Sequence, residues 1–434
     1  MKMTNFQLIF TGAFVFFIVC GLVAFSLYTT KSNNIGNVVV WGTLDGGTMS
    51  KLINDLSQQD KSYQSVTYVE RPAATFVSDV INAMASGTGP DLVLISQDQL
   101  NAFSNKLSVI PYSAVSQSTY VSSYIAESQL FLTADGAFAL PFVINPMVLY
   151  WNRNLVSSAG LGQPPKYWDD LLTTAQKLTV LDANNNVKKS AIAMGSWDNV
   201  AYAKQIVAAL FMQAGDSITQ YDQTGALRSV FGQTPQGAPE NPASSALQFY
   251  TEFANPSKVT YSWNRSLPKS TDAFTAGDAA LYVGFASDYP DLLSRNPNLN
   301  IGVALLPQIQ GNSTALTFGQ LTGIAIPRTA FNPTGALTIA EKLSGATAVG
   351  AAAAAFGFPP VRLDVPTDTS ANAAQAVFYQ SSLIARGWID PDYAASDAIF
   401  RTMVDAVVSN KSLPDTAVQD AAQSLQALIS HTGQ

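Results

Sequence analysis

The chain from residue 38 onward opens with a regular alternation of apolar runs and helical patterns. Residues 38–41 (VVVW) predict a buried strand, and residues 49–56 carry apolar side chains at helical spacing behind a candidate N-cap at Thr48. The pattern repeats with strands over residues 66–69 and 92–95 and a helix over 76–84. Strands that alternate with helices predict an α/β fold, in which a parallel sheet is covered by helices on both faces.

Ligands of such sheets bind at the carboxyl ends of the strands. Two loops therefore border the expected cleft, residues 41–47 after the first strand and residues 96–99 after the third. They contain Asp45, Gln97 and Asp98, whose side chains can form hydrogen bonds with hydroxyl or amino groups. The glycines of the first loop match neither GxGxxG nor a P-loop, so a bound nucleotide is not expected.

The amino-terminal thirty residues carry one positive side chain, Lys2, followed by an apolar stretch over residues 6–28. About twenty apolar residues are enough for a helix to cross the hydrocarbon core. Cationic residues tend to stay on the cytoplasmic side, so the rest of the chain is expected outside the cell membrane, anchored by this helix. A buried core helix is the alternative. Cys20 raises the possibility of lipid attachment, but the bulky residues before it favour an uncleaved anchor.

The composition excludes several kinds of function. The 434 residues carry a net charge of −7 without a cluster of Lys and Arg, which argues against nucleic acid as a partner. The sole cysteine, Cys20, lies in the apolar stretch, and the sole histidine, His431, is four residues from the end. Disulfides, zinc sites and nucleophiles paired with histidine are therefore not expected, which leaves an enzyme only carboxylate chemistry.

Six segments after the apolar stretch carry recognisable patterns. The first two are ASGTGPDLVL over residues 85–94 and ALPFVINPMVLYWNRNLVSSAGLGQPPKYWDDLLTTAQKLT over residues 139–179. Four more follow in order, namely AFTAGDAALYVG (273–284), GVALLP (302–307), FGFPPVR (356–362) and two closing helices over 404–429. Together these segments resemble the extracellular solute-binding proteins of ABC importers, of the maltose-binding type.

The resemblance implies a two-lobed periplasmic-binding-protein fold with a hinge between the lobes and a ligand groove between them. It divides the chain into an anchor and tether (1–36), lobe 1 (37–143 and 285–325) and lobe 2 (144–284 and 326–434). It further implies an extracytoplasmic receptor that is tethered to the membrane. This receptor would pass a small polar solute to ABC permease subunits, and a carbohydrate is the solute class that the resemblance favours. Neither covalent chemistry nor a cofactor is implied.

Four matched positions stand where the family contacts its ligand, and these are Asp45, Asp98, Asn145 and Asp397. Asn145 replaces an acidic residue of the maltose-binding pattern, while Ile95, Ser287 and Asp397 replace aromatic residues that stack on a sugar. These departures place maltodextrin specificity in doubt and admit other polar solutes.

A second group of candidates comes from the expected second lobe and crossing segments. Trp197, Asp198 and Asn199 follow a strand over residues 191–194, and an aromatic side chain beside hydrogen-bonding groups suits a sugar ring. For Trp197 the alternative is a core residue. The further candidates are Phe285, Ser287 and Asp288 after the second crossing, and Trp388 in ARGWIDP.

The residues also admit two other functions. An exported hydrolase would use two carboxylates such as Asp45 and Asp98, and a sensory receptor would serve a signalling partner instead of a permease. Residues 182–188 imitate a calcium loop, but Val187 occupies the position that needs glycine, so a turn between two strands is expected there.

Overall fold

The computed structural model describes residues 11, 14–20, 35–222, 224–234, 241–312, 314–367 and 372–432. Most of the expected membrane helix over residues 6–28, and the tether up to residue 34, lie outside the described residues. Within the described part of the chain, no helix combines the length and apolar character needed to cross a membrane.

The strands form one large mixed sheet and two small antiparallel pairs. The main sheet has eleven strands, and its central order is β2-β1-β3-β14-β7-β12-β9-β8. Its members are β1 (Val38–Gly42), β2 (Val66–Glu70), β3 (Leu92–Ser96), β4 (Leu107–Ser108), β7 (Ala139–Asn152), β8 (Val180–Leu181), β9 (Val187–Ile192), β12 (Ala279–Phe285), β13 (Ile301–Ala304), β14 (Thr317–Pro327) and β15 (Ala385–Arg386). The small pairs are β5 (Ile110–Pro111) with β6 (Gly136–Ala137), and β10 (Thr219–Tyr221) with β11 (Leu227–Ser229).

Helices cover both ends of this sheet. Those of the first half are α2 (Gly46–Gln59), η1 (Lys61–Ser65), α3 (Phe76–Ala85), α4 (Leu100–Phe103), α5 (Gln117–Ser123), η2 (Ala126–Phe131), α6 (Arg153–Ser158), α7 (Trp168–Leu178) and α8 (Ala203–Gln213). Those of the second half are α9 (Pro242–Glu252), α10 (Ser270–Thr275), η3 (Ala286–Asp288), α11 (Tyr289–Arg295), α12 (Pro333–Leu343), α13 (Ala346–Phe356), α14 (Ala373–Leu383), α15 (Tyr393–Val408) and α16 (Pro414–Thr432).

Lobe 1 begins with the predicted alternation of strands and helices. β1 pairs in parallel with β2 and with β3, which confirms the parallel arrangement expected from the first hundred residues. The predicted start of the first helix was wrong by one turn. Asp45, not Thr48, caps α2, and its carboxylate accepts a hydrogen bond of 2.7 Å from the backbone N–H of Thr48.

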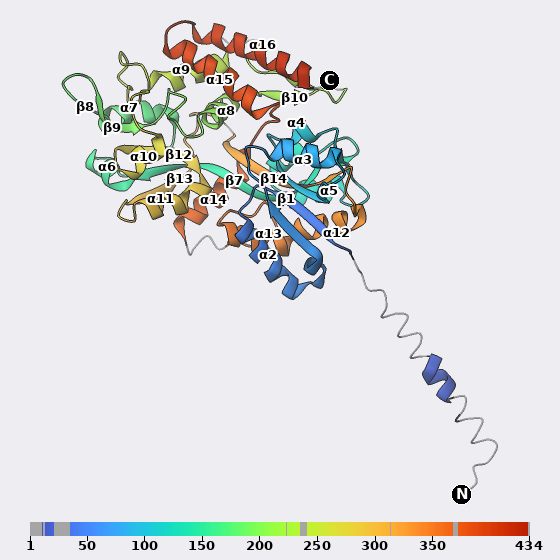
Figure 1. The fold of residues 1–434 in the computed structure, drawn as a ribbon. Helices are drawn as coiled ribbons and strands as arrows, with labels where there is room; N and C mark the ends of the chain where they lie inside the picture. Colours follow the sequence, from blue (N-terminus) through green and yellow to red (C-terminus); the bar gives the residue numbers. More distant parts are fainter. Residues whose placement is uncertain are drawn as a thin grey trace.

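Two long strands, β7 and β14, run through the centre of the molecule (Figure 1). The first half of β7 pairs with β14, and its second half, from Met147 to Asn152, pairs with β12 and β13. Beyond its pairing with β7, β14 also pairs with β3. Because these two strands connect both ends of the sheet, they are the elements about which the two ends can move relative to each other.

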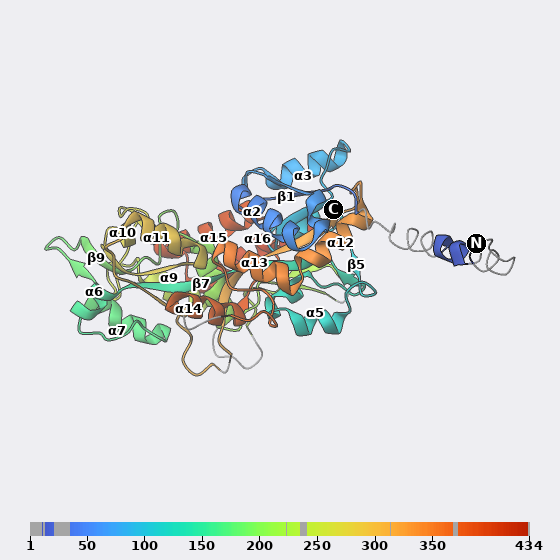
Figure 2. The ribbon, with the colours of Figure 1, turned by 90° about the horizontal axis from the view of Figure 1, so that it is seen from below.

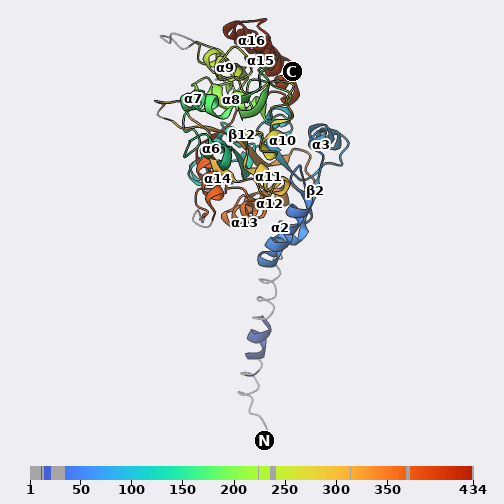
Figure 3. The same ribbon diagram turned by 90° about the vertical axis from the view of Figure 1, so that its left-hand side faces the viewer.

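Lobe 2 surrounds the other end of the sheet. β12 is antiparallel to β7 and parallel to β9, while α8, α9, α15 and α16 pack together above them (Figure 3). The segment that imitates a calcium loop is a turn between β8 and β9, as expected, in which Asp182 accepts hydrogen bonds from the backbone of Asn184 and Asn186. No group of three or more potential metal-binding side chains occurs among the described residues.

The lobe boundaries differ from those expected. β13 pairs with the second half of β7, so residues 286–304 stay in lobe 2 after β12 instead of crossing to lobe 1. α12 packs on β1 and β14, and α13 packs on α2, so both helices lie with lobe 1 (Figures 1 and 2). We therefore propose that lobe 1 also includes residues 333–356 and that β14 is the second crossing strand.

Candidate ligand-binding site between the lobes

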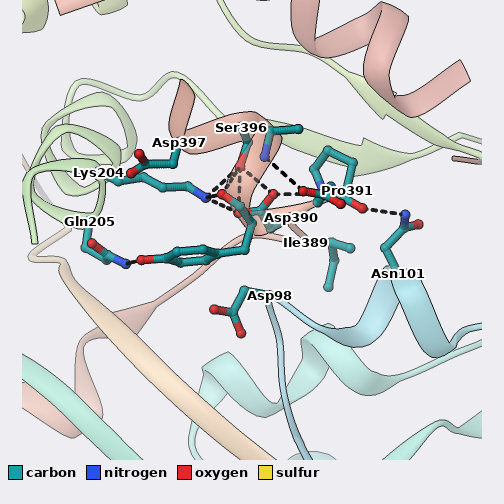
Figure 4. Close-up of polar contacts among 12 residues, drawn as sticks. Asp98, Asn101, Lys204, Gln205, Ile389, Asp390, Pro391, Ser396 and Asp397 are labelled. Carbon is teal, nitrogen blue, oxygen red and sulfur yellow. Dashed lines mark hydrogen bonds and ion pairs between the residues drawn. The ribbon is translucent and has the colours of Figure 1, made fainter. Parts of the chain in front are cut away.

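A buried polar group of lobe 2 is centred on Lys204 of α8 (Figure 4). Its ammonium is buried and donates hydrogen bonds to Asp390 Oδ2 (2.5 Å), Ser396 Oγ (2.6 Å) and the backbone oxygen of Tyr393 (2.9 Å). Ser396 also donates to Asp390 Oδ1 at 2.7 Å. Burial raises the pKa of the Asp390 carboxyl, and the Lys204 charge acts in the opposite direction. We call Lys204, Asp390 and Ser396 the Lys204 cluster.

Tyr393 is the exposed aromatic residue that this cluster supports. Its ring centroid lies 4.0 Å from Lys204 Nζ, and its hydroxyl accepts a 3.2 Å hydrogen bond from Gln205. The side chain is 46% exposed, so one part of the ring is anchored over the cation and the rest is accessible. Burial of the hydroxyl raises the pKa of Tyr393, and the nearby Asp98 carboxylate adds to that effect.

Asp98 approaches this group from lobe 1. It follows β3, is half-buried and accepts a hydrogen bond from Ser96 Oγ. Burial raises the pKa of its carboxyl, while the charge of Lys204 lowers it. A direct bond between the lobes lies next to it, because Asn101 Nδ2 donates to the backbone oxygen of Pro391 at 3.0 Å (Figure 4). Asp98 of lobe 1 thus lies close enough to Lys204 and Tyr393 of lobe 2 for their charges to act on one another.

A second polar chain in the lobe 2 face begins at Trp197. This side chain is buried, and its indole N–H points to Asp397 Oδ2 at 3.3 Å. Arg401 lies 3.9 Å from Asp397 and forms a 3.1 Å ion pair with Asp198. The structure therefore brings the predicted residues Trp197, Asp198 and Asp397 together, with Arg401 as the link between the two carboxylates.

Asn145 and Ser287, predicted from different crossing segments, are direct partners. Asn145 Nδ2 donates to Ser287 Oγ at 2.9 Å, and Asn145 Oδ1 accepts from the Ser287 backbone N–H at 3.0 Å. Ser287 is exposed. The pair ties β7 to the end of β12 beside the crossing strands.

The other predicted residues are occupied by structural contacts. Asn199 uses its amide and oxygen on Asn264, Leu267 and Trp263. Phe285 is buried against Tyr202, and Asp288 accepts hydrogen bonds from Tyr202 and Tyr282, so both belong to the packing of η3. Trp388 is buried and stacks on Phe400.

In lobe 1, two predicted residues also have structural roles. Gln97 is buried and donates to the Gly319 backbone oxygen while it accepts from the Leu321 N–H, which joins it to β14. Asp45 caps α2, and the hydrogen bonds from Thr48 lower the pKa of its carboxyl. We leave Gln97, Asp45, Asn199, Phe285, Asp288 and Trp388 out of the proposed contact set.

The candidates expected from the sequence do not include Lys204, Tyr393, Asp390 or Arg401. One signal was present, because Lys204 is the only charged residue in the apolar segment AKQIVAALF of α8. A charge in such a segment has to find a partner when it is buried. Its partner is 186 positions away, and nothing local identifies it.

Two α/β lobes that share two strands, with polar side chains from both lobes and an exposed tyrosine from lobe 2, define a two-lobed binding protein. Residues 52–378 match the family described as bacterial extracellular solute-binding protein. The chain belongs to this family, which confirms the resemblance drawn from the six segments. Because the family consists of binding proteins, the alternative of a carboxylate-dependent hydrolase is set aside.

Solved structures of similar fold support the two-lobed architecture. The cyclic α-maltosyl-1,6-maltose-binding protein of Arthrobacter globiformis has a TM-score of 0.73 and 16% identity, over 91% of this chain and 99% of that one. The sugar-binding protein MalE of Xanthomonas citri also has a TM-score of 0.73, with 18% identity over 91% and 98%. An ABC transporter solute-binding protein of Thermotoga lettingae, bound to α-D-tagatose, has a TM-score of 0.67 and 19% identity over 91% and 100%.

Proposed function

We propose that this chain is the substrate-binding component of an ABC importer and that it captures a sugar or oligosaccharide between its lobes. The observation that carries the proposal is the approach of Asp98 from lobe 1 to Tyr393 and the Lys204 cluster of lobe 2. The three similar structures named above are proteins described as binding sugars or bound to one, which supports the ligand class.

The chemistry of these side chains suits a sugar. The exposed part of the Tyr393 ring offers an apolar face to the C–H groups of a pyranose or furanose ring. The carboxylates of Asp98 and Asp397 accept hydrogen bonds from hydroxyl groups, and Arg401 donates them. The proposed contact set is Asp98, Asn145, Trp197, Asp198, Ser287, Tyr393, Asp397 and Arg401.

Transport follows from closure of the lobes about β7 and β14. The ligand stabilises the closed arrangement by the difference between its binding free energies for the closed and open arrangements. A permease would then recognise the closed form. The apolar stretch over residues 6–28 serves as the membrane anchor in this proposal. Within it, residues 14–20 are helical and their side chains are exposed, including Phe14 at 63% and Phe17 at 72%, so they offer an apolar surface to lipid.

Replacement of Tyr393 by alanine is expected to weaken ligand binding at least tenfold, which corresponds to about 1.4 kcal/mol. The ligand is first selected by a thermal-shift screen with maltose, maltotriose, tagatose, mannobiose, polyols and amino acids, and its affinity is then measured by calorimetry. Tyr393→Phe retains the ring and is expected to retain most of the affinity.

The matched control is Tyr167→Ala, since Tyr167 is a similarly exposed tyrosine (39%) at the start of α7. Its removal should leave the affinity unchanged. An unchanged affinity of Tyr393→Ala would contradict the proposed site, and a screen in which only amino acids bind would contradict the proposed ligand class.

A further inference from the structure

Glu127 is a buried carboxyl without a hydrogen-bond partner. It lies in η2 of lobe 1, is 1% exposed, and neither of its side-chain oxygens has a partner among the described residues. A buried carboxylate in such a place loses its hydration without replacement. The site therefore accommodates the neutral, protonated form far better than the charged form.

Two glycines make room for this carboxyl. A Cβ atom at Gly319 of β14 would lie 1.8 Å from Glu127 Oε2, and one at Gly387 would lie 2.7 Å from Oε1. The carboxyl is thus in contact with the backbone of the crossing strand on one side and with the segment after β15 on the other. No side chain larger than hydrogen fits at Gly319 while Glu127 keeps this position.

The segment after β15 connects directly to lobe 2. We call residues 387–390 the joint segment. Within it, Trp388 stacks on Phe400, the Ile389 backbone oxygen accepts from Thr219, and Asp390 forms the ion pair with Lys204. Glu127 therefore lies where lobe 1 meets the segment that supports the lobe 2 half of the candidate site.

The charged side chain that acts on Glu127 in the described structure is Arg386 of β15, whose guanidinium donates to its own strand at Ala385 O (2.6 Å). The side chains that lie with Glu127 around the Cβ position of Gly387 belong to Gln97 and Leu130, which are uncharged. Burial raises the pKa of Glu127 to about 8, and Arg386 lowers it. The change of charge therefore falls in an experimentally accessible range.

We propose that Glu127 is a pH-dependent lock between lobe 1 and the joint segment. The protonated carboxyl fits its buried site and lets the joint segment pack against η2. The carboxylate requires water, and water reaches it when the joint segment moves away. Because the pKa is raised on folding, this contribution to stability is complete below the ordinary pKa of a glutamate, 4.5, and is lost as the pH rises to about 8.

The test uses the full chain without ligand, so its outcome does not depend on the proposed function. Amide hydrogen exchange of the joint segment is measured at pH 6.5 and pH 9 and expressed as protection factors, together with the radius of gyration from small-angle scattering. In the unmodified chain, protection is expected to fall at least tenfold at pH 9, with an increase in the radius of gyration. In Glu127→Gln both quantities should be independent of pH.

Asp216 offers a matched control. It is also buried, burial raises its pKa to about 6, and it accepts a hydrogen bond from the Gly232 N–H within lobe 2. Asp216→Asn should leave the pH response of the joint segment intact. Glu127→Met, a second uncharged variant, replaces Glu127→Gln if that protein does not fold. An unmodified chain without a pH response, or a response that persists in the uncharged variants, would overturn the proposal.

Discussion

Replacement of Lys204 by methionine is expected to lower the free energy of unfolding by about 3–5 kcal/mol, because it leaves Asp390 as a buried charge without its partner. The side chains of Lys204 and Asp390 are 4% and 2% exposed, so water cannot replace the lost ammonium. Chemical denaturation with urea, followed by the fluorescence of the tryptophans, measures the change. Loss of the cation beneath Tyr393 should also weaken ligand binding.

An exposed ion pair provides the control for this prediction. Lys51 and Asp55 lie 2.7 Å apart on α2 with side chains that are 78% and 54% exposed, so Lys51→Met should change stability by less than about 0.5 kcal/mol. The double variant Lys204→Met with Asp390→Leu should regain much of the loss, because no buried charge remains. A loss below 1 kcal/mol in the single variant would show that the Lys204 cluster is not the stabilising group described here.

Substitution of Gly195 by alanine is expected to destabilise the protein by about 3 kcal/mol or more. This glycine has φ of +88°, and an added Cβ would lie 2.7 Å from the Ala254 backbone nitrogen and 3.0 Å from the Tyr250 backbone oxygen. Neither neighbour is the end of a flexible side chain, so the backbone itself would have to move. Because Gly195 lies two residues before Trp197, the same shift should reduce ligand affinity.

The variant Gly215→Ala separates the steric overlap of the added Cβ from the cost of the left-handed backbone conformation. The φ of Gly215 is +87°, but no atom of the described residues lies within 4 Å of an added Cβ, so Gly215→Ala carries only the cost of the left-handed conformation, about 1 kcal/mol. Thermal and urea unfolding of the two variants should therefore differ by about 2 kcal/mol. Equal losses would mean that the overlap at Gly195 relaxes without cost.

Much of lobe 1 could be predicted from local pattern. The strands and helices from β1 to β3 follow from apolar periodicity, since each element buries one face or both against its neighbours. The capping residue was less certain, because Asp45 and Thr48 are both good caps and bond to each other in the structure. The choice between them depends on the residue at which the backbone turns into the helix. Helix ends cannot be located from sequence to within the three positions that separate Asp45 and Thr48.

The second crossing strand could not be identified from the sequence pattern. β12 is buried along its whole length, as a crossing strand is expected to be, yet it stays in lobe 2 between β7 and β9. β14, whose sequence TFGQLTGIAIP includes three polar residues, makes the crossing. The hydrophobic pattern predicts that a strand is buried. It does not predict which strands lie beside it in the sheet, because these come from distant parts of the chain.

Some residues of the candidate site could be proposed from the sequence, and others could not. Asp98, Trp197, Asp198 and Asp397 could be proposed because they follow predicted elements or match positions of the family, and their role as ligand contacts stays a prediction. Tyr393 and the Lys204 cluster could not, because their character depends on partners far away in the sequence. An exposed tyrosine becomes a candidate platform only once a buried lysine is found 4.0 Å beneath its ring.

The sequence by itself determined the alternation of strands and helices in the first hundred residues and the family, since each depends on residue type and local order. Tertiary structure alone decided how β7, β12 and β14 pair, which polar residues are occupied by structural bonds, and that both Glu127 oxygens are buried without a hydrogen-bond partner among the described residues. These properties depend on burial and on pairs of groups that can be 290 residues apart, as Asn101 and Pro391 are. A side chain's charge and hydration are set by those neighbours, not by its position along the chain.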